Sequence, residues 1–229
     1  MMGSSGDARL ERFGVSAERV RAAVGLRRLG HLVVGRQVED VDLAELAQVV
    51  EGWVSRLEDR PVRHRGMGGV GAAALEMWSS EAPVDGEALS HFPDCVVSGV
   101  ANPLGIGIEV RRDGDDAVAE VSLGPAFEGA PGQAHGGVVA AIFDDVMGYQ
   151  LSILKVPAFT GRLSVTYRAP TPVGVPLRFR ASVVERSERR LEMAATAETD
   201  DGAVFAEAAA TFVIVPLERM LAATRAASS

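Results

Sequence analysis

The sequence contains a single cysteine, Cys95, among its 229 residues. No intrachain disulfide can therefore form, and a metal site built from several cysteines is excluded. This cysteine usage is typical of the reducing cytoplasm, where we expect the protein to be located. The histidines show no metal-site spacing, so we expect neither a metal ion nor another cofactor. They are His31, His64, His91 and His135.

The sequence also lacks an excess of positive charge and an apolar run of membrane-spanning length. The formal net charge is -8 at pH 7, whereas nucleic-acid binding usually depends on phosphate neutralisation by Lys and Arg. Neither a Gly-rich phosphate loop after a strand nor a G-x-S-x-G nucleophile motif occurs. We therefore expect no nucleic acid and no membrane as partner, and small-molecule chemistry is favoured.

Helical periodicity appears in two segments near the N-terminus, residues 16–29 and 42–57. In the second segment apolar residues recur on one face from Leu43 to Leu57, which predicts an amphipathic helix. Asp42 followed by Glu45 predicts a capping box at its start. The apolar face must be covered by the outer side of a sheet, by a partner subunit or by the mouth of a binding pocket.

Residues 61–93 are Gly-rich and mixed, which predicts a linker with at most a short helix at 72–78. We therefore divide the chain into an N-terminal helical extension with its linker (1–91), a main domain (92–216) and a C-terminal tail (217–229).

Within the main domain the pattern changes to alternation of apolar and polar residues. It predicts strands at 106–110, 117–123, 163–167, 175–183, 191–198 and 204–215. Asp-Gly turns at 113–115 and 200–202 predict two hairpins. A long apolar segment between the second and third strands predicts a buried helix. An α+β domain, with a mostly antiparallel sheet curled around one central helix, satisfies this order because each element covers the other's apolar face.

The stretch from Glu128 to Gly148, EGAPGQAHGGVVAAIFDDVMG, contains the start of that helix. A His-Gly-Gly turn opens it, and the residues that follow are apolar on nearly every side. Asp144 and Asp145 lie in the middle, where an ionised side chain is costly to bury unless it is used. We expect Asp145 to face a polar neighbour or the solvent edge, and the family resemblance described next assigns the chemistry to Asp144.

Three segments and the order of elements resemble the PaaI-like hot-dog-fold thioesterase family, and within it the acyl-CoA thioesterases of the THEM4 and THEM5 type. They are CVVSGVANPLG from Cys95, the EGAPGQAHGG turn and TGRLSVTYRAPTP from Thr160. The resemblance covers residues 92–216 and leaves the N-terminal helices outside it. It implies a hot-dog domain that hydrolyses acyl-CoA thioesters to free acid and CoA.

The resemblance implies two sets of site residues. The catalytic set is His135, Gly136, Gly137, Asp144 and Thr160. The substrate-binding set is Glu128, Gly129, Tyr167, Arg168, Ala169, Pro170 and Arg180. In many relatives a polar residue stands where this chain has Gly129, so any role of that side chain is lost here.

The physical chemistry of these residue types agrees with thioester hydrolysis. Backbone N–H groups at a helix start, reinforced by the helix dipole, can polarise the thioester carbonyl, and glycine lets that carbonyl approach. Asp144 would act either as a general base for water or as a nucleophile. Thr160 would hold the water or orient Asp144, and His135 would position the thioester or the turn.

Asp144 lies nine residues beyond His135, about 13 Å along one helix axis, so a single helix cannot bring both to one small group. The resemblance implies a homodimer, or a dimer of such dimers (a homotetramer), in which the turn of one chain meets the aspartate of the other.

Charge is also distributed unevenly. Residues 155–190 contain eight basic and two acidic residues, a net +6, so the remainder carries -14. A basic segment of this kind would suit binding of the phosphates of coenzyme A, and Arg168 is the better candidate for that contact. Basic side chains that simply face water from exposed strand positions would give the same pattern. Two alternatives to hydrolysis stay open, a non-catalytic acyl-CoA or fatty-acyl sensor and, with less weight, a hot-dog dehydratase.

Overall fold

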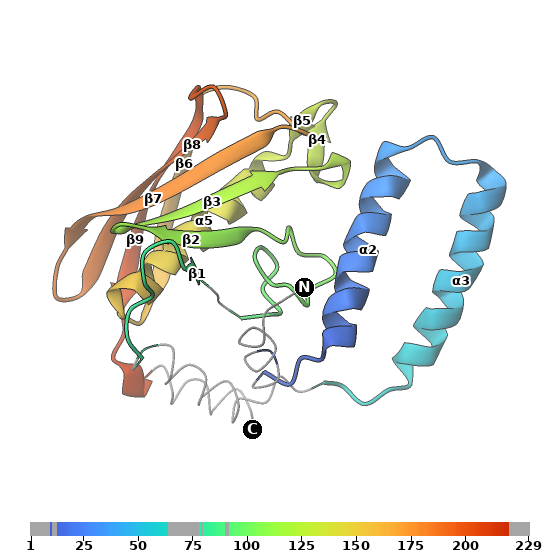
Figure 1. Ribbon diagram of the computed structural model, residues 1–229, viewed down its shortest axis with the longest axis horizontal. Helices are drawn as coiled ribbons and strands as arrows, with labels where there is room; N and C mark the ends of the chain where they lie inside the picture. Colours follow the sequence, from blue (N-terminus) through green and yellow to red (C-terminus); the bar gives the residue numbers. More distant parts are fainter. Residues whose placement is uncertain (1–9, 11–12, 64–77, 79, 90–91, 220–229) are drawn as a thin grey trace.

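The computed structural model describes residue 10 and residues 13–63, 78, 80–89 and 92–219, and every structural statement below concerns these residues. A curved sheet wraps around the helix α5 (Gly136–Leu154), and two further helices, α2 (Ala17–Gly35) and α3 (Asp40–Glu58), lie to one side (Figure 1). Most of the short helix expected at 72–78, and most of the C-terminal tail, lie outside the described residues.

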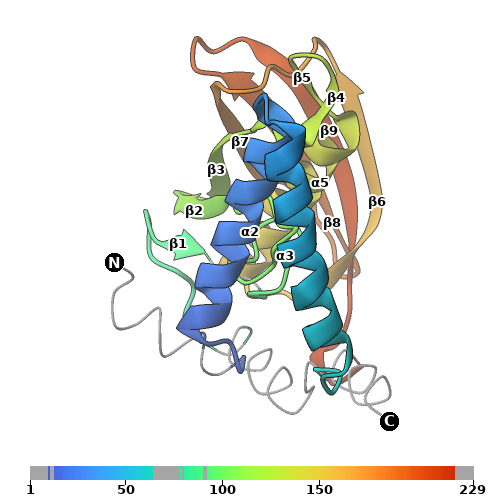
Figure 2. The same ribbon diagram turned by 90° about the vertical axis from the view of Figure 1, so that its right-hand side faces the viewer.

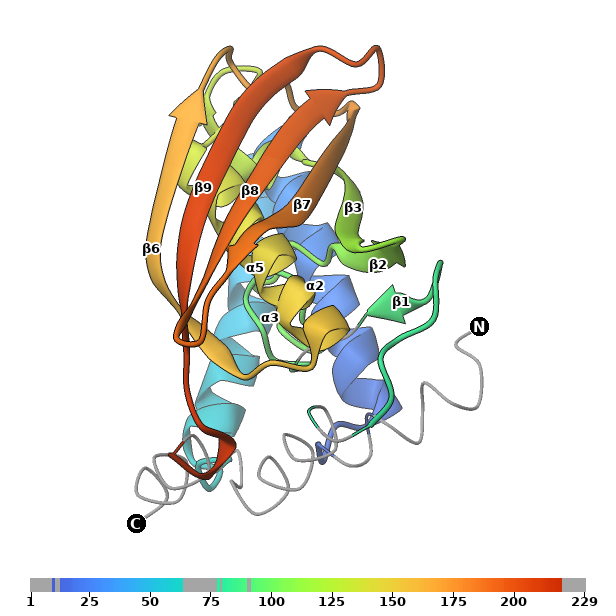
Figure 3. The same cartoon turned by 90° about the vertical axis from the view of Figure 1, so that its left-hand side faces the viewer.

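The main sheet is antiparallel throughout, in the order β1-β2-β3-β7-β8-β9-β6. Its strands are β1 (Ala88–Leu89), β2 (Glu109–Asp113), β3 (Asp116–Ser122), β6 (Ala158–Tyr167), β7 (Pro176–Arg186), β8 (Arg190–Thr199) and β9 (Val204–Ile214). Figure 3 shows the long strands crossing α5, with β6 at one edge. The predicted α+β class, with an antiparallel sheet around a central helix, is confirmed.

Small side chains line the sheet where it faces α5. Buried alanines recur along the inner strands, among them Ala181, Ala195, Ala197, Ala206 and Ala210. They let an apolar helix approach the sheet closely, and large rings fill the remaining space. Phe179 lies edge-on to Phe143 at 5.1 Å and to Phe205 at 5.9 Å between ring centroids. Phe143, Phe179 and Phe205 thus form part of the buried core.

Contrary to the expectation that the chain lacks an apolar run of membrane-spanning length, α5 is long and apolar enough to cross a membrane by length and composition. More than half of that apolar window is buried inside the fold, and a core helix passes the same test. Its buried residues are Val139, Ile142, Phe143, Val146, Met147, Tyr149, Gln150, Leu151, Ser152 and Ile153. The apolar character of α5 is therefore explained by the sheet around it.

Two strand boundaries follow from glycine. The β2–β3 turn places Gly114 at φ 63°, as the Asp-Gly pattern predicts. The first strand begins three residues later than predicted, because Gly107 at φ 77° interrupts extended backbone. The amides of Ile106 and Gly107 instead donate to the carbonyls of Val96 and Val97, at 3.2 and 2.7 Å.

α2 is anchored to the main domain by polar contacts. The Arg27 guanidinium donates to the carbonyl of Asn102 at 2.7 Å and, through longer bonds, to those of Gly99 and Val100. Burial lowers the pKa of Arg27 from its ordinary value. Ser16 caps the start of the helix, since its hydroxyl accepts from the Arg19 amide at 3.2 Å. The predicted helix at 16–29 is confirmed and extends further.

α3 is confirmed as a helix, but its start differs from the prediction. It begins at Asp40 after Glu39, with no side-chain capping bond, so the capping box at Asp42 and Glu45 is wrong. The Asp42 and Leu43 amides donate to the Glu39 carbonyl, which places Asp42 inside the first turn. None of the residues of α3 is buried.

We expect Arg27→Leu to lower the free energy of unfolding by about 1–3 kcal/mol, because three part-buried carbonyls lose their charged donor. Thermal unfolding and trypsin cleavage within α2 would measure the effect. The matched control is Arg28→Leu, one residue further along the same helix and exposed. Equal stability and equal cleavage of the two variants would contradict the anchoring role.

Candidate active site

The His135 side chain caps the helix that it precedes. Its Nδ1 accepts a hydrogen bond from the Gly137 amide at 2.9 Å, and its own amide donates to the Phe127 carbonyl at 2.8 Å. Because Nδ1 is an acceptor, the neutral ring carries its proton on Nε2. The imidazole is therefore arranged to donate from Nε2 and not to take a proton at Nδ1.

This cap corrects one detail of the predicted helix start. The Gly137 N–H is taken by His135 and is not free to polarise a carbonyl. Within the described part of the chain, the Gly136 N–H has no acceptor, so it is the amide available to a ligand at the positive end of α5.

Glycine is required around this turn for steric reasons. A Cβ atom at Gly129 would lie 3.0 Å from the Cα of His135 and 3.1 Å from its ring. A Cβ atom at Gly136 would lie 3.2 Å from the hydroxyl of Tyr167. The Tyr167 hydroxyl donates to the Gly136 carbonyl at 2.6 Å. The structure thus brings together His135, Gly136, Gly137, Gly129 and Tyr167 at one end of α5.

The short elements before α5 hold this end in place. They are the 3-10 turn η1 (Pro125–Phe127) and the two-stranded pair β4 (Glu128–Ala130) and β5 (Gln133–Ala134). The His31 ring of α2 packs edge-on against Phe127 at 4.9 Å, and its Nδ1 accepts from the Ala126 amide at 3.2 Å. α2 therefore supports η1, and the Phe127 carbonyl supports His135.

The segment after β6 reaches the same end of the helix. The Ala134 amide donates to the Thr171 carbonyl at 2.9 Å, and the amides of Arg168 and Ala169 donate to the Phe205 carbonyl. The Arg168 guanidinium binds Glu207 at 2.6 Å, on the exposed surface. Arg168, Ala169 and Pro170 are all exposed, so they lie at the rim of the turn. Glu128 is also exposed, and its backbone pairs with Ala134 in the β4–β5 pair.

Asp144 and Thr160 form a second group. The Thr160 hydroxyl donates to Asp144 Oδ1 at 2.8 Å. The described residues offer no hydrogen-bond partner to Asp144 Oδ2. Thr160 lies in the edge strand β6, beside a register shift between Thr160 and Arg162. The pairing predicted for these two residues is present in the structure.

Asp145 is the more perturbed of the two aspartates. Burial raises its pKa above the ordinary value of 3.8, and the negative charge of Asp144 adds a smaller increase. The Cys95 thiol donates to Asp145 Oδ1 at 3.3 Å, while Oδ2 is buried without a partner in the described part of the molecule. Ser98 partly offsets the rise, although its buried hydroxyl makes no hydrogen bond of ordinary length.

The sequence analysis did not predict that Cys95 and Ser98 lie beside Asp145. Asp145 does face polar neighbours, as predicted, but it does so inside the protein. Cys95 and Ser98 both belong to the CVVSGVANPLG segment that carries the family resemblance. The segment therefore indicated a structural role, but its sequence does not predict which aspartate it contacts.

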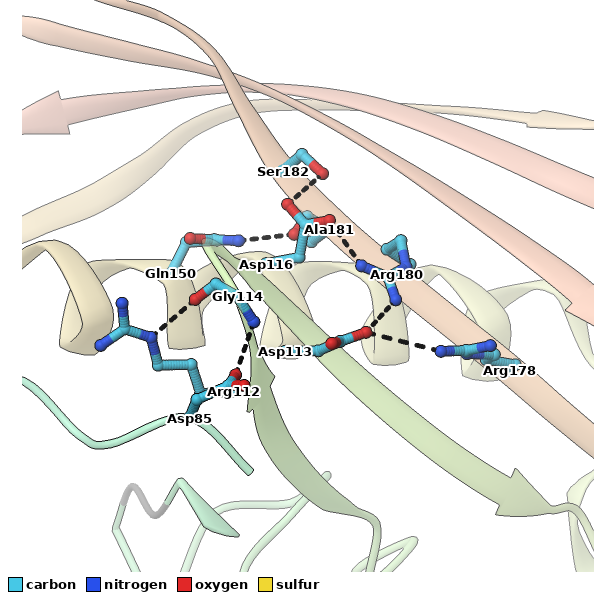
Figure 4. A network of polar contacts seen from close by, with 10 residues as sticks. All are labelled: Asp85, Arg112, Asp113, Gly114, Asp116, Gln150, Arg178, Arg180, Ala181 and Ser182. Atoms are coloured by element: carbon cyan, nitrogen blue, oxygen red, sulfur yellow. Dashed lines mark hydrogen bonds and ion pairs between the residues drawn. The ribbon is translucent and has the colours of Figure 1, made fainter. Parts of the chain in front are cut away.

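Arg180 lies in a different part of the protein. Its guanidinium donates to Asp116 at 2.6 Å and also pairs with Asp113, which contacts Arg178 at 3.6 Å (Figure 4). This network ties β7 to the β2–β3 turn. The structure does not bring Arg180 to His135 or Asp144, and its charge is already paired by two carboxylates.

The described chain therefore holds two separate groups of the predicted residues on one helix. The His135 group lies at the start of α5, and the Asp144–Thr160 pair lies about 13 Å further along, at 1.5 Å per residue. The residues described include no group of three or more His, Cys, Asp or Glu side chains that could hold a metal ion.

Comparison with known proteins defines the class. A crystal structure of a thioesterase superfamily protein aligns with 85% of this chain and 90% of its own, with a TM-score of 0.69 and 23% sequence identity. This likeness shows the fold, which is the hot-dog fold with N-terminal helices.

Sequence comparison points to the same superfamily over part of the chain. Residues 131–206 match the family model described as thioesterase superfamily. Acyl-coenzyme A thioesterase THEM5 of Mus musculus is 31% identical over 96 residues, which cover 42% of this chain and 39% of that protein. THEM4 of Xenopus laevis is 31% identical over 91 residues, 39% of this chain and 41% of that protein. Within residues 131–206 the chain is thus similar to the thioesterase superfamily, and the chain spans about two fifths of the length of the curated relatives it matches.

The pKa of Asp145 leads to a prediction for stability. The folded carboxyl binds its proton more tightly than the unfolded one, so its contribution to stability is complete below pH 3.8 and is lost as pH rises through the folded pKa. Asp145→Asn, which stays neutral, should raise the free energy of unfolding at pH 7 by on the order of 1 kcal/mol. The gain should shrink towards pH 4.

Thermal or urea unfolding of wild type and variant would measure this difference at pH values from just above the ordinary Asp pKa of 3.8 to slightly above neutrality, about pH 4 to pH 8. Asp200→Asn, at an exposed turn, serves as the control and should show little pH-dependent difference. A destabilised Asp145→Asn protein at pH 7 would contradict the prediction.

Proposed function

We propose that this protein hydrolyses acyl-CoA thioesters to free acid and CoA. The observation that carries the proposal is the Thr160–Asp144 hydrogen bond of 2.8 Å on a helix that starts with the His135 cap. Similarity to acyl-coenzyme A thioesterases over part of the chain supports it. A carboxylate held by one hydroxyl and otherwise open to a ligand suits a group that must take a proton or attack a carbonyl.

In the proposed reaction the thioester carbonyl binds at the start of α5. The Gly136 N–H and the positive end of the helix dipole stabilise negative charge on the carbonyl oxygen, and His135 Nε2–H donates a further hydrogen bond to the bound thioester. Asp144 takes the proton of a water that attacks the carbonyl carbon, or attacks that carbon itself. In the first route the carbon–sulfur bond breaks, the free acid is released, and the CoA thiolate takes the proton that Asp144 holds. In the second route the carbon–sulfur bond breaks to leave an acyl anhydride on Asp144; water hydrolyses it to the free acid and the Asp144 carboxylate, and the proton released goes to the CoA thiolate.

The proposal requires two copies of the chain. β6 is a ten-residue strand at the edge of the main sheet, with most of its residues exposed. A long exposed edge offers unpaired N–H and C=O groups to a second strand. Antiparallel pairing of two β6 edges would place two α5 helices side by side in opposite directions. The turn of one chain could then meet the Asp144–Thr160 pair of the other, which gives two equivalent sites.

The coenzyme A half of the substrate would lie at the exposed rim formed by Arg168, Ala169 and Pro170. Arg168 is more than half exposed in its pair with Glu207, so it can exchange a surface carboxylate for a phosphate at little cost. The pairing of Arg180 with Asp113 and Asp116 gives no support to its predicted part in substrate binding.

We expect Asp144→Asn to lower the rate of thiol release from acyl-CoA by about 100-fold or more, because the amide can neither accept the proton nor attack. A panel of acyl-CoAs of different chain length and aryl content, with a thiol reagent as readout, measures this rate. Thr160→Val should lower it less and Thr160→Ser should restore it. Asp145→Asn is the matched control and should stay within a few-fold of wild type.

Tight binding of the acyl-CoAs without turnover by the wild-type protein would overturn the proposal in favour of the sensor alternative. Formation of an enoyl product without thiol release would favour the dehydratase.

A shared site makes two inactive variants complement each other. A heterodimer of His135→Ala and Asp144→Ala has one site with both changes and one with neither. Random mixing in equal amounts should therefore restore about a quarter of wild-type thiol release. The readout is activity after subunit exchange, with exchange verified by native mass spectrometry. Complete exchange without recovered activity would contradict the shared site.

A further inference from the structure

α3 carries an apolar stripe that its own chain leaves uncovered. Val50, Trp53, Val54 and Leu57 lie on one face at helical spacing, and each is more than 40% exposed. Their neighbours Leu43 and Leu46, at the other end of the same stripe, are half-buried. A helix of this length in water gains most of its stability from packing an apolar face. The uncovered half of the stripe therefore requires a partner surface.

The position of α3 restricts what this surface can be. Figure 1 places α2 between α3 and the sheet, so the outer face of the sheet cannot cover the stripe. In Figures 2 and 3, α3 lies on the same side of α2 as the edge strand β6. That is the side on which a second copy of the chain stands when two β6 edges pair.

Charge favours a second copy over a lipid surface. α3 contains five acidic residues and one arginine, a net charge of -4, which opposes binding to an anionic membrane. Residues 155–190, which include β6 and the β7–β8 turn, carry a net +6, and three of their arginines (Arg168, Arg178 and Arg180) are paired with carboxylates of the same chain. Arg162 on β6 and Arg186, Arg189 and Arg190 at that turn are exposed. The acidic flanks of α3 and the basic surface of another copy are complementary.

We propose that the stripe Val50, Trp53, Val54 and Leu57 packs against a second copy of this chain, so that each α3 reaches across the dimer. The inference rests on the dimer of the proposed function, and it assigns the N-terminal extension to the subunit interface. α2 then has two effects: through Arg27 and His31 it is fixed to its own domain, and it holds α3 towards the partner.

Photo-crosslinking tests which chain covers the stripe. A photoreactive phenylalanine analogue replaces Trp53 in the full-length protein, and 14N-labelled and 15N-labelled subunits are mixed until they exchange. We expect crosslinked peptide pairs that combine both isotopes. The same analogue at Gln48, on the opposite face of α3, is the control and should give few of them. Pairs of one isotope only, or no crosslinks at position 53, would overturn the inference.

Subunit affinity gives a second readout. Trp53→Asp should weaken the dimer about tenfold or more in sedimentation equilibrium, because a charge enters an apolar contact. Ser55→Asp introduces the same charge on the exposed opposite face and should change the dissociation constant less than about twofold. Since no residue of α3 is buried in its own chain, circular dichroism of both variants should match wild type. Equal dissociation constants for the two variants, or a monomeric wild-type protein, would overturn the inference.

Neither experiment depends on turnover, so the two proposals can fail separately. Mixed-isotope crosslinks in a protein that releases no thiol would reject the proposed hydrolysis and leave the interface in place. Thiol release with complementation, but with crosslinks confined to one chain, would reject the interface and leave the hydrolysis in place.

Discussion

The burial of α5 within a concave sheet is the constraint on which the rest of the structure depends. Alanines on the inner strands let the helix lie close to the sheet, and Phe143, Phe179 and Phe205 fill the space that remains. Ten residues of α5 are buried in this way. Asp144 and the start of the helix remain on the less covered side, next to β6. The same packing thus stabilises the domain and leaves Asp144 and the first turn of α5 on the side of the helix that the sheet covers less.

The geometry of that side is set by residues far away in the sequence. His135 holds the Gly137 amide, Phe127 holds His135, and His31 of α2 packs on Phe127. This series of contacts joins the N-terminal extension to the turn where the proposed thioester carbonyl binds. A rigid first turn matters because an amide can stabilise developing charge only if it already points at the oxygen. The N-terminal extension therefore contributes to the proposed site by holding the first turn of α5 in place through Phe127 and His135.

The two adjacent aspartates Asp144 and Asp145 lie in different environments because they point to different sides of α5. Successive residues differ by about 100° around a helix axis, so Asp144 meets Thr160 at the sheet edge and Asp145 meets Cys95 beneath the loop at 92–107. Burial raises the pKa of Asp145 above its ordinary value.

The sequence by itself determined the order of elements, the buried helix and the pairing of His135 with a glycine turn, because periodicity and turn residues are local properties. It also placed Asp144 and Thr160 together through a family resemblance. Only the tertiary structure decided that His135 accepts from the Gly137 amide, that Arg180 is paired by Asp113 and Asp116, and that Asp145 is part-buried beside Cys95. These outcomes depend on contacts between residues far apart in the chain, and a local pattern contains no information about which distant group fills a given space.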